Sequence, residues 1–456
     1  MQTALPAALL TSLENIQDFN KILFEQVHAS GVQVTSVRLN PAKKIQLQQS
    51  NLAYKSAVPW CLHGMYLQQR PSFTYDPFFH AGCYYVQEAG SMFLWHVLQQ
   101  LFANKERQLK VLDLCAAPGG KSTLLASFFT EGLIVANEVI QTRAAVLAEN
   151  TIKWGAANIV VTNNDPSAFA RLENFFDLLV IDAPCSGSGL FRKQPEAIEE
   201  WSEENVKLCS QRQQRILSDV YTSLKADGII IYSTCSYSKE ENENILDWLM
   251  ENFSVENIRL PVNDEWGITE TMSDKHGCYG YRFYPYKTES EGFFIAAFRK
   301  KDGDENCRVM KSSLVKLSKA DNLLIEDWVK HSAEEFFFRH NDDVYAVPAL
   351  FAADINRIIH ALKIKKTGVH TGTVKGKDFI PSHELAMSML LNENISSVQL
   401  DKENTLLFLK KLDFQLPPNI SNGWQAVRFE NIWLGWIKVI GSRVNNYYPA
   451  AWRILK

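Results

Sequence analysis

The stretch KVLDLCAAPGGK, residues 110–121, decides the fold of this chain. An apolar run ends in small residues and two glycines, and a helix-like segment follows. Such a turn lets the backbone approach a ligand closely, and the start of the next helix attracts a negatively charged group. The spacing matches neither a Walker loop nor the G-x-G-x-x-G of dinucleotide-binding proteins. It fits a compact ligand with a carboxylate, such as the methionine end of S-adenosylmethionine.

Four further apolar runs follow along the chain. They are GLIVANE (132–138), NIVVTN (158–163), FDLLVIDAP (176–184) and GIIIYSTC (228–235), with helix-like segments between them. Unbroken runs of Val, Ile and Leu predict strands buried on both faces, which is typical of a parallel sheet covered by helices. Residues 106–300 are therefore expected to form a doubly wound, Rossmann-like α/β domain. The stretch 281–300 predicts an antiparallel hairpin at the edge of the sheet.

The rest of the chain differs in composition from this central part. Residues 1–105 are rich in aromatic side chains and predict a mainly helical α+β extension at the N-terminus. Residues 301–385 predict a linker, which begins with KDGDEN, and a helical region. Short β-like runs with Gly and Pro breaks predict a small β domain at 386–456. The lysine-rich segment 363–377 is interpreted as a solvated loop, with a phosphate-contacting loop as the alternative.

The composition is that of a soluble globular protein with several domains. The chain has 456 residues, of which 46% are hydrophobic and 21% charged. No apolar run approaches the roughly 18 residues of a membrane span, so no membrane contact is expected. Eight cysteines without C-x-x-C pairs or histidine clusters indicate neither a zinc site nor a disulfide framework, so we expect no metal and a cytoplasmic location. The net charge of −4 argues against a general coat for polyanions.

Candidate ligand-binding residues follow the first three strands, because the ligands of a doubly wound sheet lie beyond the carboxyl ends of its strands. Glu138, after the second strand, can hold both hydroxyls of a nucleoside ribose, and a helix cap is the alternative. After the third strand, Asp165 or its neighbour Asn164 is a candidate for the adenine amino group, and Asp165 can equally be a cap. The turn after the first strand contributes Cys115, Ala116, Ala117, Pro118, Gly119, Gly120 and Lys121.

Two cysteines follow the fourth and fifth strands. Cys185 lies in DAPCSGSG, which begins with Asp182, and Cys235 lies in YSTCS. A single cysteine after a strand is often only a small buried hydrophobe. The fourth and fifth strands of such a sheet can be neighbours, so both sulfurs can face one pocket. Two cysteines set among serine and glycine, beside an acid and a nucleoside site, indicate chemistry.

Three of these motifs together carry a family resemblance. DLCAAPGGK, DAPCSGSG and YSTCS occur in the order found in the Sun family of RNA cytosine-C5 methyltransferases, and the chain resembles that family over residues 30–300. The segments SVRLNP (36–41), VQEAGSM (86–92) and the closing strand EGFFIAAFRK are similar as well. FIPSHELAMS (379–388) and GWIKVIGSRVNNYYPAAWR (435–453) resemble the C-terminal part of the RsmF-type branch, which ends in a PUA-like RNA-binding domain.

The resemblance implies a reaction and a role for each motif residue. C5 of cytosine is a poor nucleophile, so a thiolate must first add to C6. The resemblance assigns this attack to Cys235, although Pro184-Cys185 mimics the Pro-Cys nucleophile of other cytosine-C5 methyltransferases. It assigns assistance in proton removal and product release to Cys185, and the N3 contact to Asp182, which also borders the cofactor. Lys121 either neutralises charge nearby or only caps the edge of the sheet.

The resemblance also implies the partners of the chain. S-adenosylmethionine is the expected cofactor and small-subunit (16S) ribosomal RNA the expected substrate, with transfer RNA as the alternative. Residues 1–105 and 386–456 are expected to bind RNA, and the protein is expected to act as a monomer. Two other classes remain open: a non-catalytic S-adenosylmethionine-binding factor in ribosome assembly, and a nicotinamide oxidoreductase. The missing G-x-G-x-x-G argues against the oxidoreductase.

Overall fold

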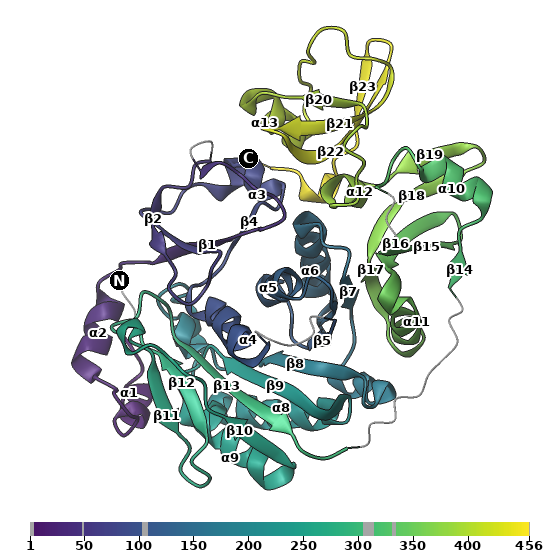
Figure 1. Cartoon of the computed structure of the whole chain (residues 1–456). Coiled ribbons are helices and arrows are strands. Elements are labelled where there is room, and N and C mark those ends of the chain that lie inside the picture. Colours follow the sequence, from purple (N-terminus) through teal and green to yellow (C-terminus); the bar gives the residue numbers. More distant parts are fainter. Residues whose placement is uncertain (1–3, 48–49, 103–107, 304–313, 331–333, 456) are drawn as a thin grey trace.

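The protein is built around one large sheet (Figure 1). The computed structural model describes residues 4–47, 50–102, 108–303, 314–330 and 334–455. The large sheet has ten strands: nine follow the order β11-β12-β13-β9-β8-β5-β6-β7-β17, and β10 pairs with β13. The five apolar runs form its parallel strands, which confirms the doubly wound fold. These strands are β5 Lys110–Asp113, β6 Leu133–Asn137, β7 Ile159–Thr162, β8 Phe176–Asp182 and β9 Leu224–Thr234.

Helices cover both faces of the central sheet. Successive residues of a strand point to opposite faces, so Val111 packs under one helix layer and Leu112 under the other. Both side chains are fully buried, as the unbroken apolar runs predict. The first layer contains α4 Leu94–Phe102, α5 Gly120–Phe128 and α6 Gln141–Trp154, and the second contains α8 Glu203–Tyr221, α9 Glu243–Asn252 and α11 Ala352–Ala361.

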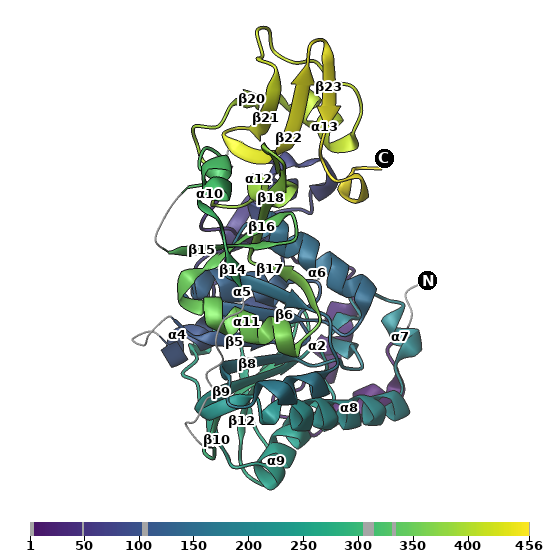
Figure 2. The ribbon, with the colours of Figure 1, turned by 90° about the vertical axis from the view of Figure 1, so that its right-hand side faces the viewer.

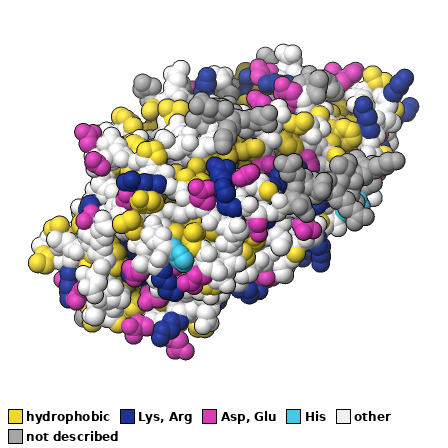
Figure 3. All heavy atoms as spheres, turned by 60° about the horizontal axis from the view of Figure 1, so that its bottom comes forward, with side chains coloured by type: hydrophobic (Ala, Val, Ile, Leu, Met, Phe, Trp, Pro, Cys, Tyr) yellow, Lys and Arg dark blue, Asp and Glu magenta, His cyan; other side chains and the backbone are white. Residues whose placement is uncertain are grey.

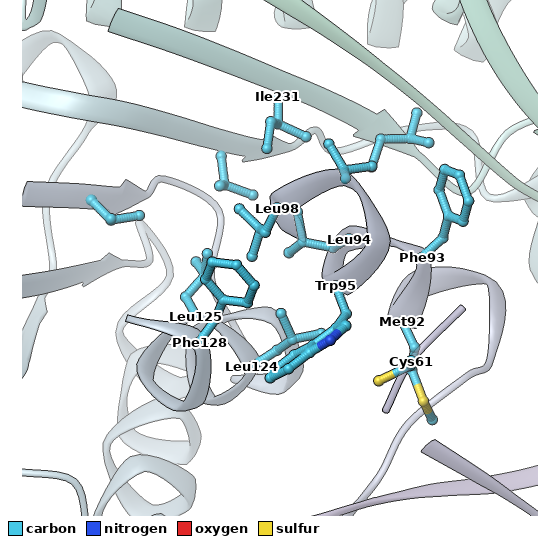
Figure 4. Close-up of a cluster of buried hydrophobic side chains, with 14 of the residues drawn as sticks. Cys61, Met92, Phe93, Leu94, Trp95, Leu98, Leu124, Leu125, Phe128 and Ile231 are labelled. Carbon is cyan, nitrogen blue, oxygen red and sulfur yellow. The ribbon is translucent and has the colours of Figure 1, made fainter. Parts of the chain in front are cut away.

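Helix α4 packs against the helix that carries the glycine turn. In Figure 4, Leu94 and Leu98 of α4 lie between Ile231 of β9 and the side chains of Leu125 and Phe128 of α5. Burying a leucine or isoleucine side chain stabilises a fold by roughly 1.5–3 kcal/mol. The cluster therefore fixes α5, whose first residue is Gly120, relative to the sheet.

The other side of the central sheet is antiparallel. Strand β13 pairs with both β9 and β12, which confirms the hairpin expected at 281–300 but places it inside the sheet. Strand β11 forms the edge instead, because it adds one more strand beyond the hairpin. These strands are β10 Val255–Ile258, β11 Thr269–Met272, β12 Tyr279–Phe283 and β13 Phe293–Lys300.

The N-terminal extension has a small sheet of its own, in the order β2-β3-β1-β4. Asn40, after β1, ties this sheet to the core, because its side-chain amide donates to the carbonyl oxygens of Gly82, at 2.9 Å, and of Trp154 in α6, at 3.0 Å. The elements are α1 Ala7–Leu13, α2 Lys21–Ala29, β1 Thr35–Leu39, β2 Tyr54–Ala57, β3 Gly64–Leu67, α3 Pro77–His80 and β4 Tyr84–Val86.

Residues 301–385 contain more strand than the expected linker and helical region. Their described part includes a five-stranded sheet in the order β14-β15-β16-β18-β19, while residues 304–313, with most of the expected linker and Cys307, lie outside the described residues. Besides α11, the elements are β14 Val315–Lys316, α10 Lys319–Ile325, β15 Glu335–His340, β16 Asp343–Pro348, β17 Ile364–Thr367, β18 Val369–Lys375, β19 Asp378–Pro381 and α12 His383–Met387.

The lysine-rich segment 363–377 is not a solvated loop. Strand β17 within it pairs antiparallel with β7 and extends the central sheet by one edge strand. Lys366 of β17 is buried, and its Nζ lies 2.9 Å from Oε1 of Glu384. A lysine that is buried against a distant acid looks, in sequence, like a solvated one, so the sequence alone does not reveal this strand.

The residues from β20 onward, 397–455, form a domain at one end of the molecule, remote from α8 and α9 (Figure 2). Trp436 and Tyr448 are buried in it, as expected for the core of a small β domain, whereas Tyr447 is exposed. Its Phe429 ring lies 5.3 Å from that of Phe78 in the N-terminal extension, so the two ends of the chain pack together. The elements are β20 Ser397–Gln399, α13 Lys402–Lys410, β21 Gly423–Phe429, β22 Ile432–Ile440 and β23 Arg443–Asn446.

The surface carries charges of both signs. On the face at the bottom of Figure 1, basic and acidic side chains are interspersed among apolar and neutral ones (Figure 3). This agrees with the small net charge of −4. In the described part of the chain, no helix has both the length and the apolar character that a membrane crossing requires.

Candidate active site

The turn between β5 and α5 is held against the end of β6. Ala116 donates its backbone N–H to the carbonyl oxygen of Asn137, at 2.8 Å. Gly119 has a φ of +115°, a backbone conformation that favours glycine, and a Cβ added there would lie 3.2 Å from the Leu147 side chain. The shape of the turn therefore depends on this glycine.

Asp113 lies buried beneath the turn. One of its carboxylate oxygens accepts a hydrogen bond from the Ser122 hydroxyl at 2.6 Å. Burial is the largest effect on this group and raises its pKa to about 7. Asp113 thus belongs to the support of the turn, and its side chain is fully shielded from solvent.

Two upstream segments of the family resemblance meet at the start of α5. Arg38, from SVRLNP, donates from Nε to Oε1 of Gln87, from VQEAGSM, at 2.8 Å. Its Nη2 donates to Oγ1 of Thr123, at 2.6 Å, and to the carbonyl oxygen of Gly120, at 3.2 Å. Arg38 is fully buried, and burial lowers its pKa to about 10. The sequence does not assign Arg38 and Gln87 any function, but they position the glycine turn.

Glu138 lies at the end of β6, next to the turn. Its Oε1 accepts from the backbone N–H of Ile140 at 2.9 Å, and its Oε2 lies 3.5 Å from Nη1 of Arg143. Arg143 also donates to the carbonyl oxygen of Ala117, at 2.9 Å. Glu138 therefore bonds the backbone just before α6, and Arg143 connects it to the turn.

After β7, Asn164 and Asp165 both make contacts within the protein. The side chain of Asn164 donates to the Lys363 carbonyl oxygen at 3.1 Å and accepts from the Lys363 N–H at 2.9 Å, so both ends of its amide are engaged. Asp165 caps the next turn by accepting from the backbone N–H of Ser167, and its carboxylate lies 3.5 Å from Arg215. The hydrogen bonds from Ser167 lower the pKa of Asp165, which is half-exposed.

A cavity of about 370 Å³ lies beyond the carboxyl ends of β5, β8 and β9. The sequence predicts that both sulfurs face one pocket, but only Cys235 belongs to the lining that contains the glycine turn, and Cys185 lies behind it in contact with Cys235. Of the residues predicted from sequence, the cavity is lined by Cys115, Ala116, Ala117, Pro118, Gly120, Lys121, Asp182 and Cys235. The predicted residues outside its lining are Gly119, Glu138, Asp165 and Cys185.

Asp182 and Lys121 form an ion pair within this cavity. Nζ of Lys121 lies 2.7 Å from Oδ2 of Asp182 and 5.1 Å from the ring centre of Phe293. The other carboxylate oxygen of Asp182 accepts from the Ser233 hydroxyl at 2.8 Å. Of the two interpretations open for Lys121, the geometry favours neutralisation of a nearby charge.

The two cysteines are in direct contact. Sγ of Cys185 lies 3.0 Å from Sγ of Cys235. This contact and burial raise the pKa of the Cys185 thiol well above its usual range. Cys235 is the member of the pair that faces the cavity.

A buried carboxylate holds the two cysteine loops together. Glu241 accepts from the backbone N–H of Ser186 at 2.8 Å, and its other oxygen accepts from the hydroxyls of Ser186 and Ser236, both at 2.5 Å. Ser186 and Ser236 are the residues directly after the two cysteines. Burial raises the pKa of Glu241. The sequence shows Glu241 only as one acid in a charged run, so its function was not foreseeable.

Three residues near the cysteine loops differ in exposure. Tyr237 is buried, with its ring 5.0 Å from that of Phe24, so it is a packing residue. The Arg192 side chain is buried 3.6 Å from Glu291. Lys193 lines the cavity and is a candidate contact for RNA.

The fold and this site define a Rossmann-like methyltransferase that uses S-adenosylmethionine. The central sheet has the strand order of a doubly wound fold. The glycine turn after its first parallel strand, β5, lines the same cavity as Cys235, which follows β9. Sequence profiles agree: residues 99–299 match the 16S rRNA methyltransferase RsmB/F family, and residues 5–89, 323–389 and 395–454 match the N-terminal, first C-terminal and PUA domains of RsmF.

Similar proteins place the chain more narrowly. Ribosomal RNA small subunit methyltransferase F of Aliivibrio fischeri is 30% identical over 86% of this chain and 84% of its own length. The protein of that name from Shewanella piezotolerans is 28% identical over 92% and 90%. A methyltransferase homologue from Pyrococcus horikoshii shares the fold, with a TM-score of 0.53 and 28% identity over 65% of this chain and 100% of its own. The chain belongs to the ribosomal RNA small subunit methyltransferase F family.

Proposed function

We propose that this protein transfers a methyl group from S-adenosylmethionine to C5 of a cytosine in small-subunit (16S) ribosomal RNA. The observation that carries the proposal is the pair of sulfurs 3.0 Å apart, one of which lines the cavity of the glycine turn. Membership of the family supports the RNA substrate. A nicotinamide oxidoreductase would have no use for a second thiol at this place.

The cofactor fits the residues of the turn. Its methionine end would lie against residues 115–121, Glu138 would exchange its contacts with Ile140 and Arg143 for the ribose hydroxyls, and Asp165 would meet the adenine. Asn164 is the weaker candidate for adenine because its amide is already paired with Lys363. When bound, S-adenosylmethionine supplies an electrophilic methyl group next to the cysteine pair.

Attack begins at Cys235. Its sulfur bonds to C6 of the cytosine while its proton passes to the ring at N3, beside the pair of Asp182 and Lys121. This ion pair, with Nζ and Oδ2 2.7 Å apart, stabilises the charge that moves into the ring. C5 becomes nucleophilic and takes the methyl group. The protonated Cys185 supports the attack by donating its S–H to the Cys235 sulfur, which favours the thiolate of Cys235.

Release of the methylated base uses the contact between the Cys185 and Cys235 sulfurs a second time. The Cys185 sulfur takes the proton from C5 while its own S–H proton passes to the Cys235 sulfur. The electron pair of the C5–H bond forms the double bond between C5 and C6, and the bond between C6 and Cys235 breaks with its electron pair going to sulfur. Both thiols are regenerated, and the remaining ring proton at N3 is lost to water. Cys185 is thereby required for release and not for attack.

The flanking parts of the chain are proposed to hold the RNA. We assign this task to the N-terminal extension (1–105) and the PUA-like domain (386–456), joined by residues 301–385 to the catalytic domain (106–300). Arg443 and Lys438 are candidates for phosphate contacts, and Lys438 lies 5.4 Å from the ring of Trp424. One chain contains both cysteines and the cofactor turn, so we propose a monomer that acts in the cytoplasm.

The test is a comparison of RNA from a deletion strain with RNA from its parent. Bisulfite sequencing of total RNA is expected to show one or more small-subunit ribosomal cytosines that lose protection in the deletion strain. The purified protein and S-adenosylmethionine should restore the mark. Loss of protection in a transfer RNA instead would identify the alternative substrate, and no loss in any RNA would reject the proposal.

A further inference from the structure

A buried carboxylate in the active-site cavity lacks a hydrogen-bond partner. Glu291 precedes β13, its residue is only 1% exposed, and it lines the same cavity as Cys235. Neither of its carboxylate oxygens accepts a hydrogen bond from any residue that the structure describes, and the nearest cation, Arg192, lies 3.6 Å away. Arg192 offsets the charge of Glu291, but burial of a carboxylate that accepts no hydrogen bond is costly, so such groups are rare unless a ligand satisfies them.

A neighbouring acid shows what a structural carboxylate looks like here. Glu88 also lines the cavity, but its Oε1 accepts from the backbone N–H groups of Gly90, at 2.8 Å, and Glu291, at 2.9 Å. Its Oε2 accepts from the N–H of Ser91 at 2.8 Å. Glu88 therefore holds the backbone of Glu291 in place, and the Glu291 side chain is left for another partner.

A short ladder of backbone hydrogen bonds fixes Glu291 relative to the nucleophile. Gly189 donates its N–H to the Cys235 carbonyl oxygen at 2.8 Å, and Gly292 donates to the Gly189 carbonyl oxygen at 3.1 Å. The three segments pack so closely that a Cβ on Gly189 would lie 2.4 Å from the Gly292 carbonyl oxygen. Two residues beyond Glu291, the ring of Phe293 lies against Lys121. Glu291 is thus tied to both the thiol and the ion pair.

A base held by Cys235 must present the edge opposite C6 to these groups. That edge carries N3 and the 4-amino group in cytosine, but a protonated N3 and the carbonyl oxygen O4 in uracil. Asp182 is already engaged with Lys121 and Ser233, which suits the charge at N3. Neither of these contacts distinguishes an amino group from a carbonyl oxygen at C4. An unpartnered carboxylate does so, because it accepts from N–H and repels O4.

We propose that Glu291 accepts a hydrogen bond from the 4-amino group of the target cytosine and thereby selects cytosine over uracil. This rests on the proposed function. The carboxylate gains in the bound state the partner that it lacks in the free protein, and uracil would leave it buried against an oxygen. Rejection of a base that cannot pair with a buried polar group is stronger than rejection by shape alone.

The test uses a synthetic RNA that spans the cytosine located by bisulfite sequencing. The target position carries cytosine, uracil or pyrimidin-2-one, which lacks both the amino group and O4. Methyl transfer is measured as kcat/KM for the wild type, Glu291→Ala, Glu291→Gln and the control Glu88→Gln. Thermal unfolding with and without S-adenosylmethionine confirms that each variant is folded.

A specific pattern is expected. Loss of a charged hydrogen bond lowers kcat/KM of Glu291→Ala on cytosine by about 10- to 100-fold, whereas on pyrimidin-2-one the variant and the wild type agree within about twofold. Glu291→Gln, whose amide can turn its NH₂ toward O4, gains at least about tenfold in its preference for uracil over cytosine. Glu88→Gln lowers transfer to cytosine and pyrimidin-2-one by the same factor, because its carboxylate serves the backbone.

Two outcomes overturn the inference. If Glu291→Ala loses the same factor on cytosine and on pyrimidin-2-one, Glu291 has only a structural function. If Glu291→Gln keeps the wild-type preference for cytosine over uracil, another group reads C4. Failure of the wild type to methylate the cytosine RNA would instead reject the proposed function itself, which is a separate result.

Discussion

The active site has two halves that are built in different ways. The cofactor half, residues 113–121, is held by side chains from far away in the sequence, with Arg38 as the main connection. The cysteine half, residues 182–189 and 233–238, is held together by the buried carboxylate of Glu241, which accepts hydrogen bonds from Ser186 and Ser236. The first half depends on hydrogen bonds from the N-terminal extension, whereas the hydrogen bonds from Glu241 that support the second come from within the catalytic domain.

The difference also concerns which groups without a hydrogen-bond partner face the cavity. In the cofactor half, Asp113 Oδ1 and Arg38 Nη1 have no such partner among the described residues, but neither residue lines the cavity. In the cysteine half, the Cys235 thiol and Glu291, which accepts no hydrogen bond from a described residue, both line the cavity that we propose for the base. Groups left without partners in a folded protein are expected where a ligand completes them. Binding of the cofactor and chemistry on the base should therefore be separable by mutation.

The largest effect is expected in the cysteine half. Cys235→Ser should lower methyl transfer by at least about 10³-fold, because it removes the proposed nucleophile. Cys185→Ser should also stop turnover but allow attack, so that a covalent complex of protein and RNA survives a denaturing gel. An adduct with Cys235→Ser but none with Cys185→Ser would reverse the two functions. Binding of S-adenosylmethionine, measured by calorimetry, should be unchanged in both variants.

The next largest effect should come from the support of the cofactor half. Arg38→Ala removes a buried cation and leaves Gln87 and Thr123 without their partner, which is expected to lower the free energy of unfolding by about 3–5 kcal/mol. Arg38→Lys keeps the charge but not the fork of donors, so it should be folded and bind S-adenosylmethionine about tenfold more weakly. Urea unfolding and calorimetry measure both. An unchanged affinity in Arg38→Lys would show that Arg38 does not position the turn.

A smaller effect is expected when the support of the cysteine half is changed. Glu241→Gln retains the volume but replaces one acceptor oxygen with an NH₂ group, so we expect a loss of about 1–3 kcal/mol in the free energy of unfolding. Adduct formation by the Glu241→Gln, Cys185→Ser double variant should be slower than by Cys185→Ser alone, and the affinity for S-adenosylmethionine should stay the same. If cofactor affinity falls as much as adduct formation, the two halves are not independent.

The smallest effect concerns Asp113 and pH. Its pKa is about 7 in the folded protein and 3.8 as an ordinary aspartate, so between these values the folded state holds a proton that the unfolded state has lost. The contribution of Asp113 to stability therefore falls as pH rises from about 4 to 7, by about 1 kcal/mol between pH 5 and 6. Asp113→Asn should remove this part of the dependence. Urea unfolding of both proteins at pH 5 and 6 checks it, and equal slopes would contradict the assignment.

Much of the fold was predictable because its signals are local. Five apolar runs predict the parallel strands, and the residues after β5 and β9 predict part of the cavity lining, whereas Glu138 and Asp165, after β6 and β7, lie outside it. Strand β17 was not predictable, since Lys366 is buried only by virtue of the distant Glu384. Glu241 and Glu291 lie in polar stretches that resemble solvated loops. Their importance arises from contacts with segments 50 or more residues away, such as that of Glu241 with Ser186.

Strand β17 restricts how the protein can be shortened. It comes from the C-terminal third of the chain but covers the outer side of β7, and the neighbouring Lys363 is hydrogen-bonded to Asn164. A version truncated after residue 300 would leave the β7 backbone with unpaired N–H and C=O groups. Such an edge recruits other chains, so the isolated catalytic domain is expected to self-associate. The catalytic domain therefore needs a strand from the C-terminal third of the chain to complete its sheet.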